Sequence, residues 1–322
     1  MRYREVGDAA EWDGLVAAHG GHPMQSWGWG ELKAHTGTWT AHRVVCEDDA
    51  GVFVCAAQVL VRKLPWPFRA IAYAARGPVV EDPARVPEAA DLIATWCKEH
   101  LHAVSLKVDP AVTGVELSEA WRPSATVLLA RTAVLDLSPD EDALMASLHS
   151  KKARQYIRKA RRSGVTVRAA TRDDVAVILE LYHHTAEQDD FALHEDGYYE
   201  AAFDLMGDVN QVFVAEYEGR LQAFLWNVTM PSTAFELWGG VSDEGKGLRA
   251  NYLLKWEAMC AAKAAGARLY DLNGLLNDGV SRFKMFFVDE PTEWIGAWDR
   301  PLSPLYAVWE GALAFYQKHL KK

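Results

Sequence analysis

The sequence predicts an α/β (α+β) fold built from two copies of one unit. Of its 322 residues, 50% are hydrophobic and 24% are charged, as in ordinary globular proteins. Apolar runs of strand length alternate with segments of helical periodicity. The same order of these elements occurs twice along the chain, which indicates two related α/β domains.

The first unit begins with an amphipathic helix, followed by a β-hairpin that turns at an acidic loop containing Gly51. A third strand, a helix carrying Trp96 and a strand ending at Asp109 come next. Pro110 follows that aspartate and blocks further strand pairing. The expected elements cover residues 9–18, 43–61, 70–75, 89–100 and 104–109.

The second unit repeats this order. Its hairpin turns at Gly219, its later helix carries Trp256, and its last strand ends at Asp271. We interpret Asp271 and Asn273, in the sequence YDLNG, as structural turn residues. The expected elements cover residues 173–188, 211–230, 234–238, 249–265 and 268–271, with a C-terminal helix over 305–318.

Charge is concentrated in one segment. The net charge of −10 argues against indiscriminate binding to nucleic acid or to an anionic membrane. Residues 143–171 nevertheless contain no Asp or Glu, and eight Lys or Arg. The pattern predicts a basic helix over 150–163 that ends at Gly164, followed by a strand over 165–168. This helix either binds a polyanion or is a solvated face.

Cysteine usage and hydrophobicity point to a cytoplasmic protein. Cys46, Cys55, Cys97 and Cys260 are scattered, without a CxxC motif, which favours reduced thiols over disulfides or a zinc site. We expect no cofactor and no metal. No apolar run approaches the roughly 20 residues that span a bilayer, and the charged N-terminus has no apolar signal segment.

Several motifs in a fixed order carry a family resemblance. The chain resembles the Fem family of peptidoglycan bridge-forming aminoacyltransferases, tRNA-dependent enzymes with tandem GNAT-like acyltransferase domains. No heptad pattern follows Gly266, so the chain is similar to the armless FemX type, which has no coiled-coil arm. The matching segments are residues 25–33 (QSWGWGELK), 76–79 (RGPV), 107–110 (KVDP), 151–165, 251–271 and 279–286 (GVSRFKMF).

The resemblance implies a domain plan and substrates. The first GNAT-like domain would cover residues 1–145 together with the C-terminal helix at 302–322, and the second would cover 146–301. The reaction would move an amino acid from aminoacyl-tRNA to the side-chain amine of the third stem-peptide residue of a peptidoglycan precursor, in cell-wall biogenesis. The precursor is either UDP-MurNAc-pentapeptide or lipid II. We expect a monomer, with peripheral membrane contact as a further expectation.

Two catalytic candidates follow from the resemblance. Lys284 matches the lysine of the family's FK motif, which lies beside the tRNA acceptor end and the transition-state oxyanion. Its neighbours are apolar, and burying an ammonium among them without a partner is unfavourable unless it has a function. The alternative is a lysine at a strand edge whose side chain extends into solvent. Asp109 is a candidate to orient or deprotonate the incoming amine. Its alternative role is to cap the turn that follows.

The resemblance also implies binding residues. Lys33 matches a lysine that contacts precursor phosphate, and Trp29 and Trp238 are candidate pocket walls, with core packing as the competing account. The family commonly has an Arg four residues before a Tyr, and the two side chains bind precursor phosphates. Tyr198 matches that Tyr, but His194 stands in place of the Arg, and histidine lacks the bidentate guanidinium fork. The tRNA-binding candidates on the basic helix are Lys151, Lys152, Arg154 and Arg158.

Two other functions stay open. One is a GNAT-type N-acyltransferase that uses acyl-CoA and a small amine. That function needs a Q/RxxGxG/A-type loop to cradle pyrophosphate, and Gly245–Asn251 (GKGLRAN) does not fit the spacing. The other is a catalytically inactive protein that binds tRNA or the precursor. The missing arginine suggests it, and the presence of Lys33, Asp109 and Lys284 argues against it.

Overall fold

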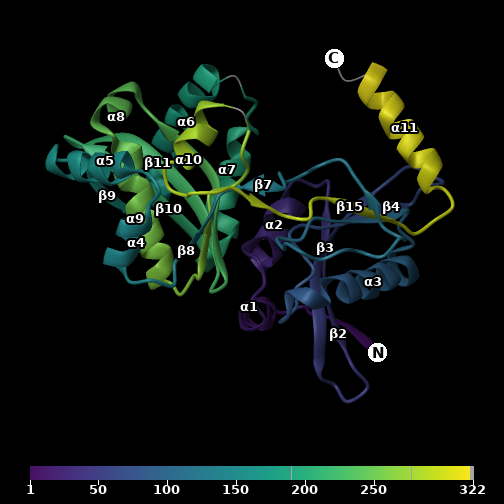
Figure 1. The fold of residues 1–322 in the computed structure, drawn as a ribbon. Helices are drawn as coiled ribbons and strands as arrows, with labels where there is room; N and C mark the ends of the chain where they lie inside the picture. The colour runs from purple at the N-terminus through teal and green to yellow at the C-terminus, as the bar shows by residue number, and fades with distance from the viewer. Residues whose placement is uncertain (190, 277, 320–322) are drawn as a thin grey trace. The chain divides into compact units, whose positions relative to one another are not determined.

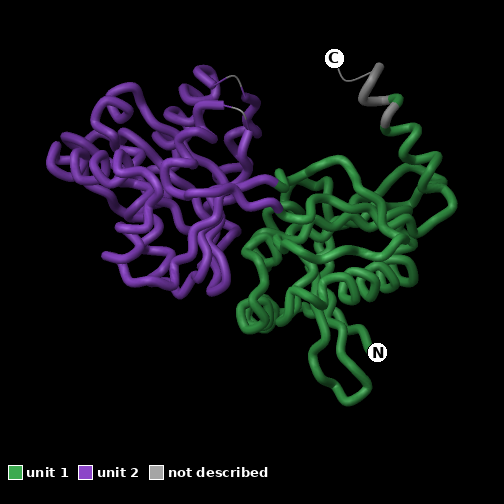
Figure 2. Tube along the Cα trace, viewed as in Figure 1, with its two compact units in different colours: residues 1–130, 294–322 green, residues 131–293 purple. Residues whose placement is uncertain are grey.

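The computed structural model, which describes residues 1–189, 191–276 and 278–319, contains two compact units. Figure 1 shows the elements, and Figure 2 shows how the chain divides. Unit 1 comprises Met1–Ala130 and Trp294–Lys322, and unit 2 comprises Arg131–Glu293. The second unit is therefore an insertion into the first along the sequence.

Unit 1 is built on a seven-stranded sheet of order β1-β2-β3-β4-β5-β15-β6. All neighbours in it are antiparallel except β4 and β5, which are parallel. The strands are β1 (Arg2–Glu5), β2 (Thr40–Glu47), β3 (Phe53–Lys63), β4 (Ala70–Ala74), β5 (Ser105–Val108), β6 (Arg122–Pro123) and β15 (Trp298–Pro301). The α-helices are α1 (Ala9–Ala18), α2 (Trp27–His35), α3 (Val86–Trp96) and α11 (Tyr306–His319).

Unit 2 is built on a six-stranded sheet of order β8-β13-β12-β11-β10-β9, again with one parallel pair, β12 and β13. Its strands are β8 (Val134–Asp136), β9 (Thr166–Ala169), β10 (Asn210–Tyr217), β11 (Arg220–Thr229), β12 (Thr233–Val241) and β13 (Leu269–Asp271). The short strands β7 (Arg131–Thr132) and β14 (Thr292–Glu293) pair separately.

The helices of unit 2 lie on both faces of its sheet (Figure 1). They are α4 (Glu141–Ser147), α5 (Lys151–Arg162), α6 (Val175–Asp189), α7 (Asp196–Leu205), α8 (Asp243–Leu248), α9 (Ala250–Ala264) and α10 (Gly279–Lys284). No helix in the described ranges is long and apolar enough to cross a lipid bilayer.

The two sheets share one topology, which confirms the predicted α/β fold and its duplication. In each unit an antiparallel hairpin (β2–β3, β10–β11) is followed by a third antiparallel strand (β4, β12) and then by a parallel one (β5, β13). The difference from the expected domain plan lies at β8 and β15. β8 pairs with β13 of unit 2 and β15 pairs with β5 of unit 1, so each crosses the boundary that the sequence suggested.

The basic segment forms a helix because it is amphipathic at helical spacing. Ala153, Ile157 and Ala160 on α5 are fully buried, at positions i, i+4 and i+7, and belong to the core of unit 2. The Ser150 hydroxyl caps the first turn by accepting from the Lys152 N–H. The predicted end at Gly164 is confirmed, since this residue has a φ of +89° just past the helix.

Two backbone hydrogen bonds close that helix end. The Gly164 N–H donates to the Arg161 carbonyl at 3.2 Å, and the Val165 N–H donates to the Ala160 carbonyl at 3.2 Å. This is the pattern in which a left-handed residue satisfies the last carbonyls of a helix. It also turns the chain directly into β9.

We therefore predict that Gly164→Ala destabilises unit 2 by about 1 kcal/mol, because a side chain disfavours the left-handed region. A β-carbon there would meet only Tyr217, at 3.8 Å, so the loss is conformational. Chemical denaturation measures it. Gly197→Ala is the control, because Gly197 lies in α7 with nothing within 4 Å of its added β-carbon. An equal loss at both positions would contradict the assignment.

Candidate active site

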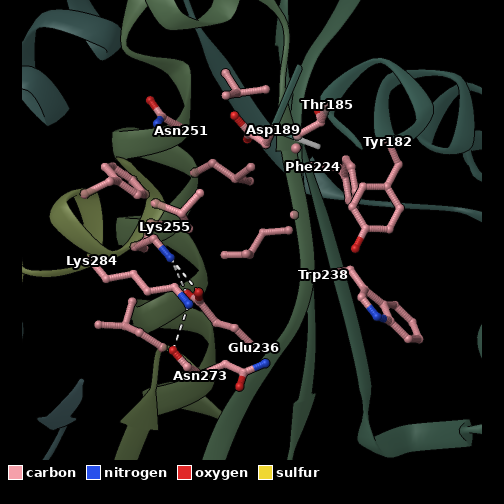
Figure 3. A pocket seen from close by; sticks show the side chains of 18 of the residues that line it. Tyr182, Thr185, Asp189, Phe224, Glu236, Trp238, Asn251, Lys255, Asn273 and Lys284 are labelled. Carbon is pink, nitrogen blue, oxygen red and sulfur yellow. Dashed lines mark hydrogen bonds and ion pairs between the residues drawn. The ribbon is translucent and has the colours of Figure 1, made fainter. Parts of the chain in front are cut away.

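A pocket of about 390 Å³ opens in unit 2 where β12 and β13 part. Figure 3 shows the side chains that line it. They come from α6, β11, β12, α8, α9, α10 and the turn after β13, so the pocket lies entirely within unit 2. Most of its wall is apolar, and a few charged side chains converge at one end.

The opening follows from the strand register. β12 and β13 pair only from Thr233 with Leu269 to Phe235 with Asp271. β13 then ends, whereas β12 continues to Val241 along β11. A bulge at Leu237, the residue skipped between the Trp226–Trp238 and Asn227–Glu236 pairs, bends β12 at the same level. The next residues of β12 therefore line a pocket instead of pairing with a neighbour.

The turn after β13 is shaped by Asp271, as the sequence analysis expected. The Asp271 carboxylate accepts from the Asn273 N–H at 2.8 Å and from the Thr132 hydroxyl at 2.5 Å. Asn273 adopts a left-handed conformation with a φ of 59°. This geometry leaves the carbonyls of Asn273 and Gly274 as acceptors for a side chain from another element.

Lys284 takes both of those carbonyls. Its Nζ donates to the Asn273 oxygen at 2.7 Å (Figure 3) and to the Gly274 oxygen at 2.9 Å. The residue ends α10, a short helix whose first turn is capped by the Asp278 carboxylate through the Ser281 N–H. Lys284 therefore lies on a helix, not on a strand edge, and its side chain lines the pocket. An ammonium has three N–H donors, so two carbonyls leave room for one more acceptor.

The surroundings weaken the proton affinity of this lysine. Burial lowers the pKa of Lys284 to about 8, the Glu236 carboxylate opposes that shift, and the Lys255 ammonium adds to it. A lysine with a pKa near 8 is mostly charged at neutral pH but can lose its proton within the working range of an enzyme.

A buried ion pair, which the sequence analysis did not identify, stands beside Lys284. The Lys255 ammonium, on α9, donates to both oxygens of the Glu236 carboxylate, on β12, one of them at 2.6 Å. Lys255 is 4% exposed and Glu236 is 6% exposed. The only sequence signal is a charge in the middle of an apolar helix (NYLLKWEAM) and another in an apolar strand (FELW).

Tyr270 extends this polar cluster beneath the pocket. It is fully buried, and its hydroxyl accepts from the Asn227 amide at 2.9 Å. Burial and the nearby Glu236 carboxylate raise the pKa of Tyr270 well above its usual value, so it stays a neutral phenol. Tyr270 and Asn227 thus form a buried polar layer next to the Glu236–Lys255 pair.

Trp238, which lines the pocket, belongs to an aromatic cluster. The Trp238 ring lies 6.0 Å from the Tyr198 ring and 4.9 Å from the Tyr199 ring in edge-on contact. The His194 ring lies 4.2 Å from the Tyr198 ring. Three predicted residues, Trp238, Tyr198 and His194, are therefore brought together. Tyr199, which the sequence analysis did not name, is the fully buried member of the cluster.

One further polar atom faces this space. Asn251, at the first turn of α9, lines the pocket, and its buried Oδ1 has no hydrogen-bond partner among the residues that the structure describes. A buried acceptor without a partner is destabilising unless a ligand donor satisfies it. The pocket therefore offers an acceptor at Asn251 and donors at Lys284.

Two of the predicted binding residues, Lys33 and Trp29, meet on α2 of unit 1. The Lys33 ammonium lies 4.4 Å from the centre of the Trp29 ring, within the range of a cation–π contact. Trp29 is 7% exposed, so it serves mainly as core. Burial lowers the pKa of Lys33 to about 8.

Asp109 is enclosed in unit 1. Its side chain is fully buried and accepts from the Tyr73 hydroxyl at 2.6 Å and from the Arg76 N–H at 2.8 Å. Burial raises the pKa of Asp109, although the Arg76 guanidinium opposes the shift. This carboxylate can therefore influence a bound molecule only through Tyr73 or Arg76. The carboxylate organises the turn after β4, not the turn that follows Asp109 itself.

The basic helix α5 presents part of its charge to solvent. Lys151, Lys152 and Arg158 are exposed, whereas Arg154 is half-buried. The Arg154 guanidinium donates to the carbonyls of Ala146 and Leu148 at the end of α4. Arg154 therefore ties α5 to the end of α4.

The chain matches one family model and several curated proteins in sequence. A family model described as an acetyltransferase (GNAT) domain matches residues 147–285. The lipid II:glycine glycyltransferase of Staphylococcus aureus (strain bovine RF122 / ET3-1) is 27% identical over 216 residues, which are 61% of this chain and 50% of that protein. This chain thus spans about half the length of the curated relatives it matches.

Solved structures share the fold over almost the whole chain. The crystal structure of FemX superposes with a TM-score of 0.81 at 21% identity, covering 96% of this chain and 99% of that one. A conserved protein of unknown function from Bacteroides thetaiotaomicron superposes with a TM-score of 0.60 at 10% identity, covering 92% and 99%. The likeness to FemX, together with the GNAT domain, confirms the predicted tandem GNAT fold.

The buried pair beside the pocket generates a stability prediction. Glu236→Gln leaves the Lys255 ammonium buried without its counter-charge, and we expect it to lower the free energy of unfolding by about 3–5 kcal/mol. The double variant Glu236→Gln with Lys255→Met should recover a large part of that loss. Denaturant titration of unit 2 fluorescence measures both.

The exposed pair of Arg161 with Glu257, also in unit 2, is the matched control. Glu257→Gln should change stability by less than about 1 kcal/mol because water screens that pair. Equal losses at Glu236 and Glu257, or no recovery in the double variant, would contradict the buried-pair account.

Proposed function

We propose that this chain is an aminoacyltransferase of the Fem family that takes part in peptidoglycan bridge formation. The glycyltransferase relative, the GNAT domain and the FemX fold together support this proposal. The donor is an aminoacyl-tRNA. The acceptor is the side-chain amine of the third stem-peptide residue of a peptidoglycan precursor. The observation that carries the proposal is the Lys284 ammonium, held by two carbonyls in the pocket between β12 and β13.

The reaction is the aminolysis of an ester. The acceptor ammonium first loses a proton, and the free amine nitrogen then attacks the ester carbonyl carbon, forming a C–N bond and a tetrahedral oxyanion. The bond from that carbon to the ribose oxygen breaks, the amine nitrogen gives up its second proton, and the ribose oxygen takes up a proton. The oxyanion needs a donor that is already in place, and such a donor commonly lowers the barrier by about 3 kcal/mol.

Lys284 supplies that donor in the proposal. Two of its N–H groups are fixed by the Asn273 and Gly274 carbonyls, so the ammonium cannot reorient when negative charge develops. The low-polarity wall strengthens its interaction with an oxyanion relative to water. With a pKa of about 8 it is roughly nine-tenths protonated at pH 7. The Glu236–Lys255 pair acts as a positioning device behind it.

The donor's amino group also finds a complementary atom. An aminoacyl ester carries an α-ammonium, and the buried Oδ1 of Asn251 is an acceptor in the same pocket. A simple acyl group has no donor for that oxygen. The pocket therefore favours an aminoacyl donor over an acetyl donor.

The acceptor and the tRNA would use the remaining predicted residues. Trp238, Tyr198 and His194 would contact the acceptor peptide at the aromatic cluster, and Lys33 beside Trp29 would bind precursor phosphate. Asp109 would act as a positioning residue through Tyr73. The exposed cations of α5, Lys151, Lys152 and Arg158, would bind the tRNA backbone.

The alternative with acyl-CoA is less consistent with the backbone. The segment Gly245–Asn251, where such an enzyme would cradle pyrophosphate, runs from α8 through one left-handed residue, Arg249, into α9. Within this segment, the N–H groups of Lys246 and Arg249 donate to the carbonyls of Ser242 and Lys246. They are therefore not free to form a phosphate-binding loop.

The test is a mass measurement. The protein is incubated with mixed charged tRNAs, acetyl-CoA, and both UDP-MurNAc-pentapeptide and lipid II, and the products are analysed by mass spectrometry. We expect the precursor to gain one amino-acid residue, and the gain to disappear when the tRNAs are deacylated. A gain of an acetyl group would support the alternative, and tight binding of charged tRNA without any transfer would indicate a binding protein.

The protonation of Lys284 predicts how kcat depends on pH. Because its ammonium is lost as pH rises through about 8, kcat should fall above that pH. Lys284→Arg keeps its charge and should lack this alkaline fall, while Lys284→Met should lower kcat about a hundredfold. Pre-steady-state transfer across a pH series measures both effects.

Lys33 titrates in the same range and is the matched control. If it only binds precursor phosphate, Lys33→Arg should change KM and leave the alkaline limb of kcat in place. An alkaline limb that persists in Lys284→Arg, or an unchanged kcat in Lys284→Met, would remove Lys284 from the mechanism.

The surface of α5 generates a binding prediction. Replacing Lys151, Lys152 and Arg158 together by Gln should weaken tRNA binding and reduce the slope of log K against log salt by about 2–3. Filter binding at several salt concentrations measures the slope. Lys98→Gln, at an exposed cation of unit 1, is the control and should leave the slope unchanged. An unaltered slope in the α5 variant would show that this helix does not contact tRNA.

A further inference from the structure

The loop between β3 and β4 of unit 1 exposes a tryptophan almost completely. Trp66, between Pro65 and Pro67, is 91% exposed, and no other large apolar side chain in the described residues is more exposed. Tryptophan is highly buried on average in folded proteins. Leaving its ring in water is unfavourable unless another surface covers it.

Cations surround this tryptophan in the sequence. Arg62, Lys63 and Arg69 are exposed at the two ends of the loop. Residues 50–80 contain no Asp or Glu, in a protein whose net charge is −10. The loop is therefore a local positive and aromatic tip on an acidic protein. We call residues 62–69 the Trp66 loop.

Helix α11 adds an apolar face to this surface. The Trp309 ring of α11 lies 5.5 Å from the Phe68 ring of the Trp66 loop, which places the helix against the loop. Val308, Ala312 and Phe315 are exposed and lie at positions i, i+4 and i+7, on one face of α11. Val308 is 59% exposed. In Figure 1, α11 projects from unit 1 after β15.

From these contacts we propose that the Trp66 loop and the exposed face of α11 form a docking surface for an anionic lipid bilayer. The Trp66 ring enters the interface between headgroups and acyl chains, where an amphipathic indole is most favourable. Arg62, Lys63 and Arg69 meet lipid phosphates, each contributing about a factor of five to the partition coefficient. The aliphatic face of α11 covers more of the same interface.

Exposed aliphatic residues distinguish this surface from a nucleic-acid site. Stacking on bases would use Trp66 and the cations, but it gives no role to Val308 or Ala312. The α5 helix shows the contrast, because its exposed residues are cations and its apolar residues are buried. RNA binding at the Trp66 loop is therefore an outcome that the test must detect.

The docking surface goes beyond the proposed transfer reaction but bears on it. If that reaction is correct, a bilayer surface selects the lipid-linked precursor over the nucleotide-linked one, because it concentrates the protein where lipid II resides. This step rests on the proposed function. Vesicle binding itself requires no substrate, so the two can fail separately.

The experiment is flotation of the full chain with vesicles of phosphatidylglycerol and phosphatidylcholine, and with phosphatidylcholine alone. We expect binding to the anionic vesicles that weakens with salt. Trp66→Ala should lower the partition coefficient about tenfold, and Arg62→Gln with Lys63→Gln and Arg69→Gln should lower it about a hundredfold. Lys151→Gln with Lys152→Gln and Arg158→Gln is the charge-matched control and should leave flotation unchanged.

A second readout locates the indole. The chain has 13 tryptophans, so the emission of Trp66 is obtained by subtracting the spectrum of Trp66→Phe from that of the wild type. Brominated lipids should quench this Trp66 emission. Circular dichroism verifies that each variant is folded. The proposal would be overturned if the wild type does not float with the vesicles, or if the loop and α5 variants lose flotation equally. It would also be overturned if the loop variants lose tRNA binding but keep vesicle binding.

Discussion

The early separation of β12 from β13 is the constraint on which the rest of the site depends. The two parallel strands pair over three residues and then diverge, which exposes the middle of the unit 2 sheet to a pocket. Asp271 ends β13 and folds the next turn so that two carbonyls face α10. The Lys284 ammonium is thus placed by backbone geometry. Backbone acceptors leave its positive charge unneutralised at close range, and that charge is what acyl transfer requires.

The duplicated fold has been put to different uses in the two units. Asp109 follows β5 of unit 1 much as Asp271 ends β13 of unit 2, and each carboxylate accepts a backbone N–H of a nearby turn. In unit 1 the surroundings of this aspartate hold Tyr73 and Arg76 in a buried network. In unit 2 they hold a pocket with a lysine. The same strand order therefore encloses a buried hydrogen-bond network at this position in one copy and a pocket in the other.

Local patterns predicted most of the fold, and interactions between distant residues account for what they missed. Alternation and turn glycines located the hairpins, and Gly164 marked the end of α5 because a left-handed residue leaves a local signature. β8 and β15 have three and four residues and are strands only because a partner lies beside them. Lys284 was found from its apolar flanks and its family motif. The Glu236–Lys255 pair was not found, because its two residues lie on different elements and the local sequence around one residue does not indicate the other.

We propose that Lys284 is a desolvated ammonium placed to stabilise negative charge that develops in the pocket. Its pKa can be measured directly by NMR of lysine side chains, with Lys284→Arg to assign the signal, in the free protein and with a phosphonate analogue of the tetrahedral intermediate. The account predicts a pKa of about 8 in the free protein and a marked rise on binding the anionic analogue. A pKa near the ordinary lysine value that does not respond to the analogue would contradict it.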